Sequence, residues 1–133
     1  MAAKAYCLDS DVVIWHLRNT KRRSTVTAFL ESLARSGRLV CSTLTVAEVL
    51  QGTRPDEEAR TRTFLGALED RAVDRGVAER AADIVRDARA KGRSMGLADA
   101  LIAATCLIEG LELVTLNVRD FSHVPGLVLV SPP

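Results

Sequence analysis

The sequence predicts an α/β protein built around a small, mostly parallel sheet. Short apolar runs alternate with longer segments in which apolar residues recur every three or four positions, as strands alternate with amphipathic helices. With 133 residues, 47% of them apolar, the chain has the size of one domain and enough apolar side chains for its core. We therefore expect a single domain over residues 1–133, without internal repeats or linkers.

The N-terminal part predicts one strand and two helices. Residues 5–8 form a short apolar run, read as a strand, which stops where Asp9 can serve as a helix N-cap. A short helix follows over residues 12–17. A second helix is predicted from an N-cap at Ser24 to Gly37, because glycine favours the position just past a helix end.

The central part predicts a brief buried strand and two more helices. The strand covers residues 39–41, and Thr43 or Thr45 can cap the helix that follows and ends at Gly52. The next helix is predicted to start at residues 55–56, because proline suits the first helical position and acidic residues suit the first turn.

The C-terminal part is predicted to hold two helices followed by two strands. These elements are expected over residues 77–91, 97–109, 111–116 and 127–130. Gly92 and Gly96 bracket the loop between the helices, and Gly110 closes the second helix. Strands thus alternate with helices from one end of the chain to the other, as an α/β fold requires.

The charge balance and the aromatic content exclude two classes of nucleic-acid-binding protein. The chain has 18 Lys and Arg and 17 Asp and Glu, a net charge of +1, which argues against a protein that binds nucleic acid by bulk neutralisation of its phosphates. Only 4% of the residues are aromatic, too few for a platform that stacks single-stranded bases. Residues 1–54 nevertheless carry a net +4 and residues 55–133 a net −3, so a polyanion should meet the N-terminal part first.

The sequence is typical of a cytoplasmic protein. The longest apolar stretch, residues 97–111, contains two acids and is too short to span a membrane. Asp9 and Asp11 interrupt the N-terminal apolar stretch, which therefore does not resemble a signal peptide. Three cysteines without CxxC spacing are expected to be reduced core residues, namely Cys7, Cys41 and Cys106.

Four acids lie in apolar surroundings: Asp9 and Asp120 follow predicted strands, Glu48 lies in the helix after a strand, and Asp99 lies in the first turn of the helix over residues 97–109. Ligands of parallel sheets bind beyond the carboxyl ends of the strands. Converging carboxylates repel one another unless a cation compensates them, and Mg²⁺ prefers oxygen ligands. Such a site can activate water against a phosphodiester. Each acid also has a simpler interpretation: Asp9 and Asp99 can cap helices, Glu48 can face solvent or an arginine, and Asp120 can belong to a turn.

Four segments resemble the PIN-domain ribonucleases, in particular the VapC toxins of bacterial toxin–antitoxin pairs. They are LDSDVVI at 8–14, TVAEVLQG at 45–52, LADALIAA at 97–104 and LVTLNVRDF at 113–121, in the order of that family. The resemblance implies a three-layer α/β/α fold and Mg²⁺- or Mn²⁺-dependent endonucleolytic cleavage of RNA, with 5′-phosphate and 3′-hydroxyl products. It also implies a homodimer and a cognate VapB-type antitoxin.

The resemblance also implies roles for individual residues. Asp9, Glu48 and Asp99 become the principal metal ligands, with Asp120 as the fourth acid and Thr115 and Asn117 as polar supports. Whether Asn117 or Asp120 faces the metal stays open, as does the number of metal ions, one or two. Ser10 could touch the site, whereas Asp11 is expected to point elsewhere.

A cluster of basic residues between two predicted helices is a candidate for guiding RNA: Arg18, Lys21, Arg22 and Arg23. The same cluster could be a solvated loop or a surface that faces the antitoxin. The isolated His16 and His123 are expected to be structural or exposed.

Two other functions remain as alternatives. One is a non-catalytic PIN-like module that binds RNA or protein, although such modules typically lose some of the acids that this chain keeps. The other is a haloacid-dehalogenase-type phosphatase with Asp9 as nucleophile, because residues 9–13 fit its DxDx[TV] pattern. The chain has no GDxxxD motif and is short for that fold with its usual cap.

Overall fold

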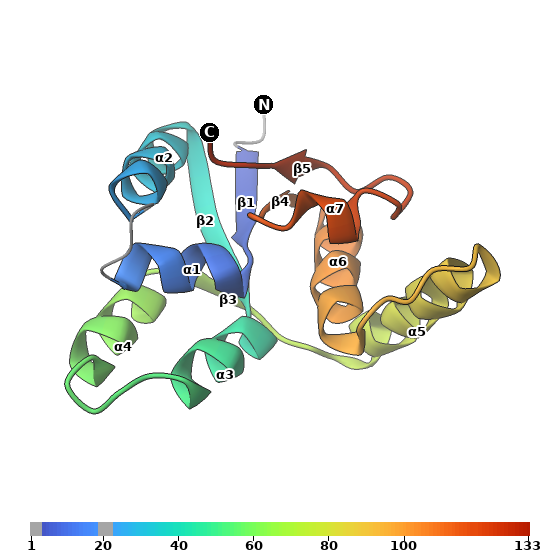
Figure 1. Ribbon diagram of the computed structural model, residues 1–133, viewed down its shortest axis with the longest axis horizontal. Helices are drawn as coiled ribbons and strands as arrows, with labels where there is room; N and C mark the ends of the chain where they lie inside the picture. Colours follow the sequence, from blue (N-terminus) through green and yellow to red (C-terminus); the bar gives the residue numbers. More distant parts are fainter. Residues whose placement is uncertain (1–3, 19–22) are drawn as a thin grey trace.

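The computed structural model describes residues 4–18 and 23–133 of the chain (Figure 1). Its elements are, in order, β1 (Lys4–Leu8), α1 (Ser10–Leu17), α2 (Arg23–Ser36), β2 (Gly37–Ser42), α3 (Thr43–Gln51), α4 (Glu58–Gly66), β3 (Glu69–Arg71), α5 (Arg75–Ala90), α6 (Leu97–Glu109), β4 (Glu112–Val114), α7 (Val118–Phe121) and β5 (Leu129–Val130). The strands form one sheet in the order β3-β2-β1-β4-β5, and every neighbouring pair is parallel. The α/β class predicted from the sequence is confirmed.

Helices cover both faces of the sheet. In Figure 1, α1 to α4 lie on one side of β1, and α5, α6 and α7 lie on the other. Successive side chains of a strand point to opposite faces of the sheet, so β1 contributes side chains to the cores on both faces. Ala5 and Cys7 join the core cluster under α5 and α6, whereas Tyr6 and Leu8 join the cluster under α1 and α2. The fold is therefore a three-layer α/β/α arrangement.

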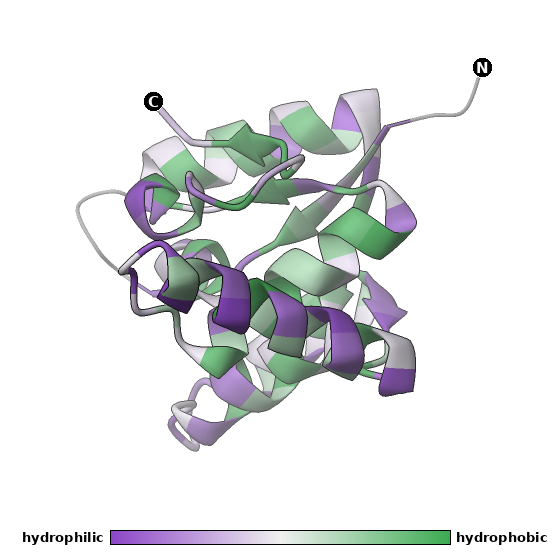
Figure 2. Ribbon diagram, turned by 90° about the vertical axis from the view of Figure 1, so that its right-hand side faces the viewer, coloured by the Kyte–Doolittle hydropathy of each residue, from purple (hydrophilic) through white to green (hydrophobic). Residues whose placement is uncertain are grey.

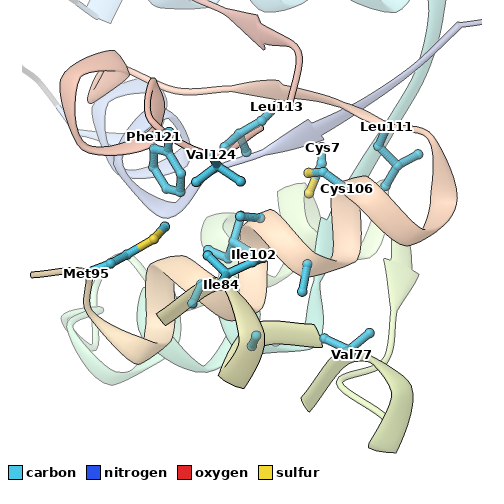
Figure 3. Close-up of a cluster of buried hydrophobic side chains, with 14 of the residues drawn as sticks. Cys7, Val77, Ile84, Met95, Ile102, Cys106, Leu111, Leu113, Phe121 and Val124 are labelled. Atoms are coloured by element: carbon cyan, nitrogen blue, oxygen red, sulfur yellow. The ribbon is translucent and has the colours of Figure 1, made fainter. Parts of the chain in front are cut away.

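The cluster under α5 and α6 shows why these helices pack as they do (Figure 3). The buried residues of α5, Val77, Ala81, Ile84 and Ala88, recur every three or four positions and face α6. The opposite face of α5, toward the viewer in Figure 2, is largely polar. The amphipathic helix predicted over residues 77–91 is thus confirmed, and the structure shows that its apolar face packs against α6.

The three cysteines are free and buried, as predicted. Cys7 of β1 and Cys106 of α6 lie in the same cluster, where Figure 3 shows their sulfur atoms. Among residues 4–18 and 23–133, no helix is long and apolar enough to cross a bilayer.

Two short elements escape the sequence pattern. β3 consists of three charged residues on the edge of the sheet, so no apolar run marks it. α7 is one turn long and follows Asn117, within a segment that the sequence leaves as a loop. β4 is also shorter than the run of residues 111–116 from which it was predicted.

Several helices begin a few residues away from their predicted starts. Ser24 does not cap α2, because the helix already includes Arg23. Ser42, rather than Thr43 or Thr45, caps α3, since its hydroxyl accepts a hydrogen bond from the Leu44 amide at 3.1 Å. Adjacent Ser and Thr residues have similar capping preferences, so the sequence alone does not distinguish them.

The two helices that follow in the chain also start elsewhere than predicted. Residues 55–57 form a turn, and α4 begins only at Glu58. α5 begins at Arg75, because the Asp74 carboxylate accepts from the Val77 amide at 2.9 Å and so caps the helix.

The register of the central strands positions the candidate site. β1 lies between β2 and β4, with Leu8 opposite Val114. The Asp9 amide donates to the Val114 carbonyl at 2.9 Å, which continues this pairing for one residue past the end of β1. The residues that follow β1 and β4 therefore meet at the carboxyl edge of the sheet.

Candidate functional site

Asp9 stands at the junction of β1 and α1 and is 6% exposed. Its Oδ1 accepts from the Ser10 amide at 2.8 Å, so Asp9 is the N-cap of α1, as predicted. Its Oδ2 accepts from the hydroxyl of Thr115 at 2.8 Å. The carboxylate therefore caps its helix and at the same time faces the residue that follows β4.

Asp11 lies at the same place, so the prediction that it points elsewhere is wrong. Its Oδ2 lies 3.2 Å from the Leu116 amide and 3.4 Å from Thr115 Oγ1, both of which can donate to it. Its Oδ1 is buried and has no hydrogen-bond partner among the described residues. Because a hydroxyl has a single proton to donate, Thr115 cannot satisfy Asp9 and Asp11 at once.

Glu48 reaches the site from α3. The hydroxyl of Ser10 donates to Glu48 Oε1 at 2.6 Å, which confirms that Ser10 contacts an acid of the predicted set. In the part of the chain that the structure describes, Glu48 forms no ion pair with an arginine or lysine. The simpler interpretation of Glu48 as the partner of an arginine therefore has no support.

Asp99 lies in the first turn of α6 and is half-buried. The N-cap of this helix is Gly96, and no side chain caps it, so the alternative role of Asp99 as an N-cap is not observed. Burial raises the pKa of Asp99 above its usual range, and the charges of Asp120 and Glu48 raise it further. Asp99 thus lies near acids that the chain brings from α3 and α7.

Asp120 and Asn117 come from the segment after β4. Asn117 Nδ2 donates to Asp120 Oδ2 at 2.7 Å, and the Asn117 amide donates to Thr115 Oγ1 at 2.9 Å. Thr115 thereby connects Asn117 to Asp9. Asp120 is exposed and lines a cavity of about 240 Å³ together with Asp99.

The acids destabilise one another's charges. Burial raises the pKa of Asp9 to about 7, the charges of Asp11 and Asp99 raise it as well, and the hydrogen bonds from Thr115 and Ser10 lower it only in part. Burial also raises the pKa of Asp11, hydrogen bonds from the backbone and from Thr115 lower it only in part, and the charge of Asp99 adds a smaller increase. A carboxylate whose pKa is raised in this way lacks a compensating positive charge.

The donor set suits a hard divalent cation. It consists of carboxylate oxygens, and the buried Asp11 Oδ1 has no partner among the described residues. Within residues 4–18 and 23–133, however, no three His, Cys, Asp or Glu side chains are already grouped closely enough to hold a metal ion. Mg²⁺ usually keeps several of its waters, so it does not require that every ligand be a side chain.

The predicted basic cluster lies away from these acids, as far as the structure describes it. Lys21 and Arg22 fall outside the described residues. Arg18 follows the C-terminal end of α1, about 12 Å along the helix from its start, and its guanidinium donates to the Gly52 carbonyl at 3.1 Å. The Arg23 guanidinium donates to the His16 carbonyl at 3.0 Å. The structure therefore does not bring Arg18 or Arg23 to the carboxylates.

The two histidines differ in their surroundings. His16 Nδ1 lies 2.8 Å from Thr27 Oγ1, and its ring centroid lies 4.6 Å from that of Phe64, which confirms a structural role. His123 is half-buried and lines the cavity beside Asp99. It also lines a second cavity, of about 410 Å³, beside α5.

Comparison with known proteins agrees with this fold. The PIN domain family matches residues 6–127. Ribonuclease VapC10 of Mycobacterium tuberculosis is 34% identical over 126 residues, which cover 95% of this chain and 90% of that protein. The crystal structure of VapBC2 from Rickettsia felis, bound to a DNA fragment from its promoter, contains a chain that aligns with a TM-score of 0.85 and 23% identity, covering 97% of this chain and 99% of that one. A toxin–antitoxin complex from Klebsiella pneumoniae aligns with a TM-score of 0.77 and 29% identity, covering 96% and 98%. The chain therefore belongs to the PIN-domain family and, within it, to the VapC-type proteins.

Proposed function

We propose that this protein is a metal-dependent endoribonuclease and the toxin of a toxin–antitoxin pair. One observation carries the proposal: Asp9 and Asp11 are held together at the carboxyl edge of the sheet, with one buried oxygen of Asp11 lacking a partner among the described residues. Uncompensated carboxylates at that edge suit a divalent cation and a phosphodiester substrate. The names of the relatives, which are ribonucleases and toxin–antitoxin complexes, support the same function.

In this proposal Mg²⁺ or Mn²⁺ is held by Asp9 and Asp99, with Glu48 and Asp120 as further ligands, directly or through water. When bound, the cation would lower the pKa of a water molecule and stabilise the charge that develops on the scissile phosphate. Asp11 contributes negative charge from beside Asp9. The reaction adds water across the phosphodiester bond, leaving a 5′-phosphate and a 3′-hydroxyl.

The polar neighbours hold these acids in place. Thr115 fixes one oxygen of Asp9 and Ser10 fixes one of Glu48. Asn117 holds Asp120 through its side-chain amide, which favours Asp120 rather than Asn117 as the residue that faces the metal. Such supporting hydrogen bonds orient metal ligands and tune their affinity.

The second part of the proposal concerns partners. We infer that the protein forms a homodimer in the cytoplasm and binds a VapB-type antitoxin. A groove of about 440 Å³ between α1 and α4 is lined by Leu17, Phe64 and Arg23, among others. Arg23 belongs to the basic cluster, so the groove favours the interpretation of this cluster as a surface that faces the antitoxin.

The two alternatives have less support. A non-catalytic module would not need the full set of acids, and all of them are present at the carboxyl edge of the sheet or beside it. A phosphatase with Asp9 as nucleophile is set aside because the chain belongs to the PIN-domain family.

The test is a cleavage assay on end-labelled single-stranded RNA. We expect cuts with Mg²⁺ or Mn²⁺ and none with EDTA, and a loss of at least about 100-fold in rate for Asp99→Asn. Asp87→Asn, which removes an exposed acid of α5, is the matched control and should keep the rate. Equal cleavage by the intact protein and Asp99→Asn, or cleavage that persists in EDTA, would contradict the proposal.

A further inference from the structure

The cavity beside Asp99 and Asp120 also contains cationic side chains. Arg93, Arg119 and His123 line it together with the two acids, and its volume is about 240 Å³. Arg93 comes from the loop between α5 and α6, whereas Arg119 belongs to α7 and His123 follows it. Two segments of the acid-rich C-terminal part thus bring positive charge next to the candidate metal ligands.

Both arginines have their side-chain donors available. In residues 4–18 and 23–133, neither guanidinium forms an ion pair or a hydrogen bond, although carboxylates line the same cavity. Several other arginines near acids are paired, as Arg38 is with Glu69 at 3.0 Å. Unpaired arginines beside an acidic site can therefore bind an anion from outside the chain.

The backbone holds the two arginines in fixed places. Gly92 adopts a φ of 74°, in the left-handed region that favours glycine, and the Arg93 amide then donates to the Ala88 carbonyl at 2.8 Å. Two residues further, Met95 enters the core cluster. Phe121 enters the same cluster from α7, two residues after Arg119 (Figure 3). The loop and α7 are thus anchored to the same core beneath the cavity.

We propose that Arg93 and Arg119 bind a backbone phosphate of the RNA strand, with His123 as a further donor, and so position the strand across the acids. This inference rests on the proposed ribonuclease function and names the residues that hold its substrate. The planar guanidinium matches the oxygens of a phosphate and can donate to two of them. The volume is smaller than the pockets of drug-sized ligands, which begin at about 300 Å³, and suits one phosphate with its sugar.

The two arginines would also reduce the electrostatic repulsion between the acids of the site and the phosphates of RNA. Carboxylates repel the phosphates of an approaching strand, and a bound cation offsets only the charge of its own ligands. Arginines in the same cavity offset the repulsion for the neighbouring phosphate. Arg18 and Arg23 do not contribute to this, because their guanidiniums donate to the Gly52 carbonyl at the C-cap of α3 and to the His16 carbonyl near the C-terminal end of α1.

The test compares two double variants that lose the same charge. Arg93→Gln/Arg119→Gln removes the proposed contacts, whereas Arg80→Gln/Arg89→Gln removes two exposed arginines of α5 that also lack partners among the described residues. The affinity for a labelled single-stranded RNA is measured by fluorescence anisotropy in EDTA, over a range of salt concentrations. The thermal unfolding of both variants is measured to verify that they fold.

We expect Arg93→Gln/Arg119→Gln to weaken RNA binding by about 10- to 100-fold, and Arg80→Gln/Arg89→Gln by less than about 3-fold. The slope of log K against log salt should fall by about 0.7, because the two arginines contact one phosphate and each phosphate contact to a single strand contributes about 0.7. In the cleavage assay, KM should rise more than kcat falls. A loss of stability alone would neither change the salt slope nor raise KM more than it lowers kcat.

The outcomes separate this inference from the proposed function. If Arg93→Gln/Arg119→Gln cuts RNA at an unchanged KM and salt slope, or if both double variants lose the same affinity, the inference is overturned and the nuclease function stands. If the intact protein leaves RNA uncut with either metal but binds it through these arginines, the inference is supported and the nuclease function fails.

Discussion

The hydroxyl of Thr115 donates to Asp9 Oδ2 at 2.8 Å, although the two residues are 106 positions apart in the sequence. The bond joins the residue after β4 to the residue after β1. The same hydroxyl accepts from the Asn117 amide at 2.9 Å, so it stands between Asp9 and the segment that carries Asp120. The fully buried Thr115 is thus the point at which the two central strands are tied together at the candidate site.

Replacing this hydroxyl should weaken the site without unfolding the protein. Thr115→Val keeps the shape but leaves the Asn117 amide and one oxygen of Asp9 without their partner, which should cost about 1–3 kcal/mol of stability. Loss of a bond that orients a ligand typically lowers metal affinity by about 10- to 100-fold. The metal affinity is measured by isothermal titration calorimetry with Mg²⁺ or Mn²⁺.

The matched control is Thr63→Val, which removes an exposed hydroxyl that bonds only within α4, to the Ala59 carbonyl. It should leave metal affinity unchanged. Equal metal affinity of Thr115→Val and the intact protein would show that Thr115 has no orienting role.

The stability of the metal-free protein should fall as the pH rises from about 4 to about 7. The pKa of Asp9 is 3.8 in the unfolded chain and about 7 in the fold, so the folded state binds a proton that the unfolded state has released. Because the folded state holds more protons in this window, stability decreases with pH and levels off above about 7. Burial raises the pKa values of Asp11 and Asp99 in the same direction.

Asp9→Asn isolates this effect, because asparagine can still accept from Thr115 but cannot ionise. Its melting temperature in EDTA should exceed that of the intact protein by little at pH 5 and by more at pH 8. A gain on the order of 2 kcal/mol in the free energy of unfolding corresponds to a rise of roughly 6–10 °C in melting temperature for a chain of this size. A difference that does not grow with pH would contradict the assignment.

The sequence predicts most of the sheet and helices because their apolar side chains recur with the period of the element. It misses β3, since an edge strand of three charged residues carries no such pattern. The carboxylates at strand ends are found because the fold class itself indicates where ligands bind. Asp11 is misjudged because its surroundings, Thr115 and Leu116, are 104 and 105 residues away in the sequence.

The distribution of charge along the sequence is a poor guide to its distribution in space. The N-terminal excess of positive charge pointed to residues 18–23, of which Arg18 and Arg23 lie beyond the far end of α1. Arg93 and Arg119 belong to the part of the chain with net negative charge, yet they line a cavity with Asp99. The fold, not the order of residues, brings these charges together.

A divalent cation should stabilise the protein, and more strongly at higher pH. Metal ligands must be deprotonated, and the acids of the site hold protons at low pH. Millimolar Mg²⁺ should therefore raise the melting temperature more at pH 8 than at pH 5.5. Asp11→Asn should reduce the shift at pH 8, because it removes charge beside Asp9, whereas the control Asp87→Asn should preserve it. A shift that is independent of pH would indicate binding elsewhere.

The bond from Ser10 to Glu48 is the shortest contact between the supporting residues and the acids, at 2.6 Å. Ser10 is the first residue of α1 and Glu48 lies on α3, so the bond joins the two helices that follow the paired strands β1 and β2. Ser10→Ala should lower kcat for RNA cleavage by about 3- to 30-fold, since a misplaced ligand raises the barrier while RNA contacts elsewhere remain. Ser32→Ala removes an exposed hydroxyl that bonds the Phe29 carbonyl within α2 and should leave kcat unchanged. Ser10→Thr keeps the hydroxyl and should retain more activity than Ser10→Ala; if both lose the same activity, the bond does not position Glu48.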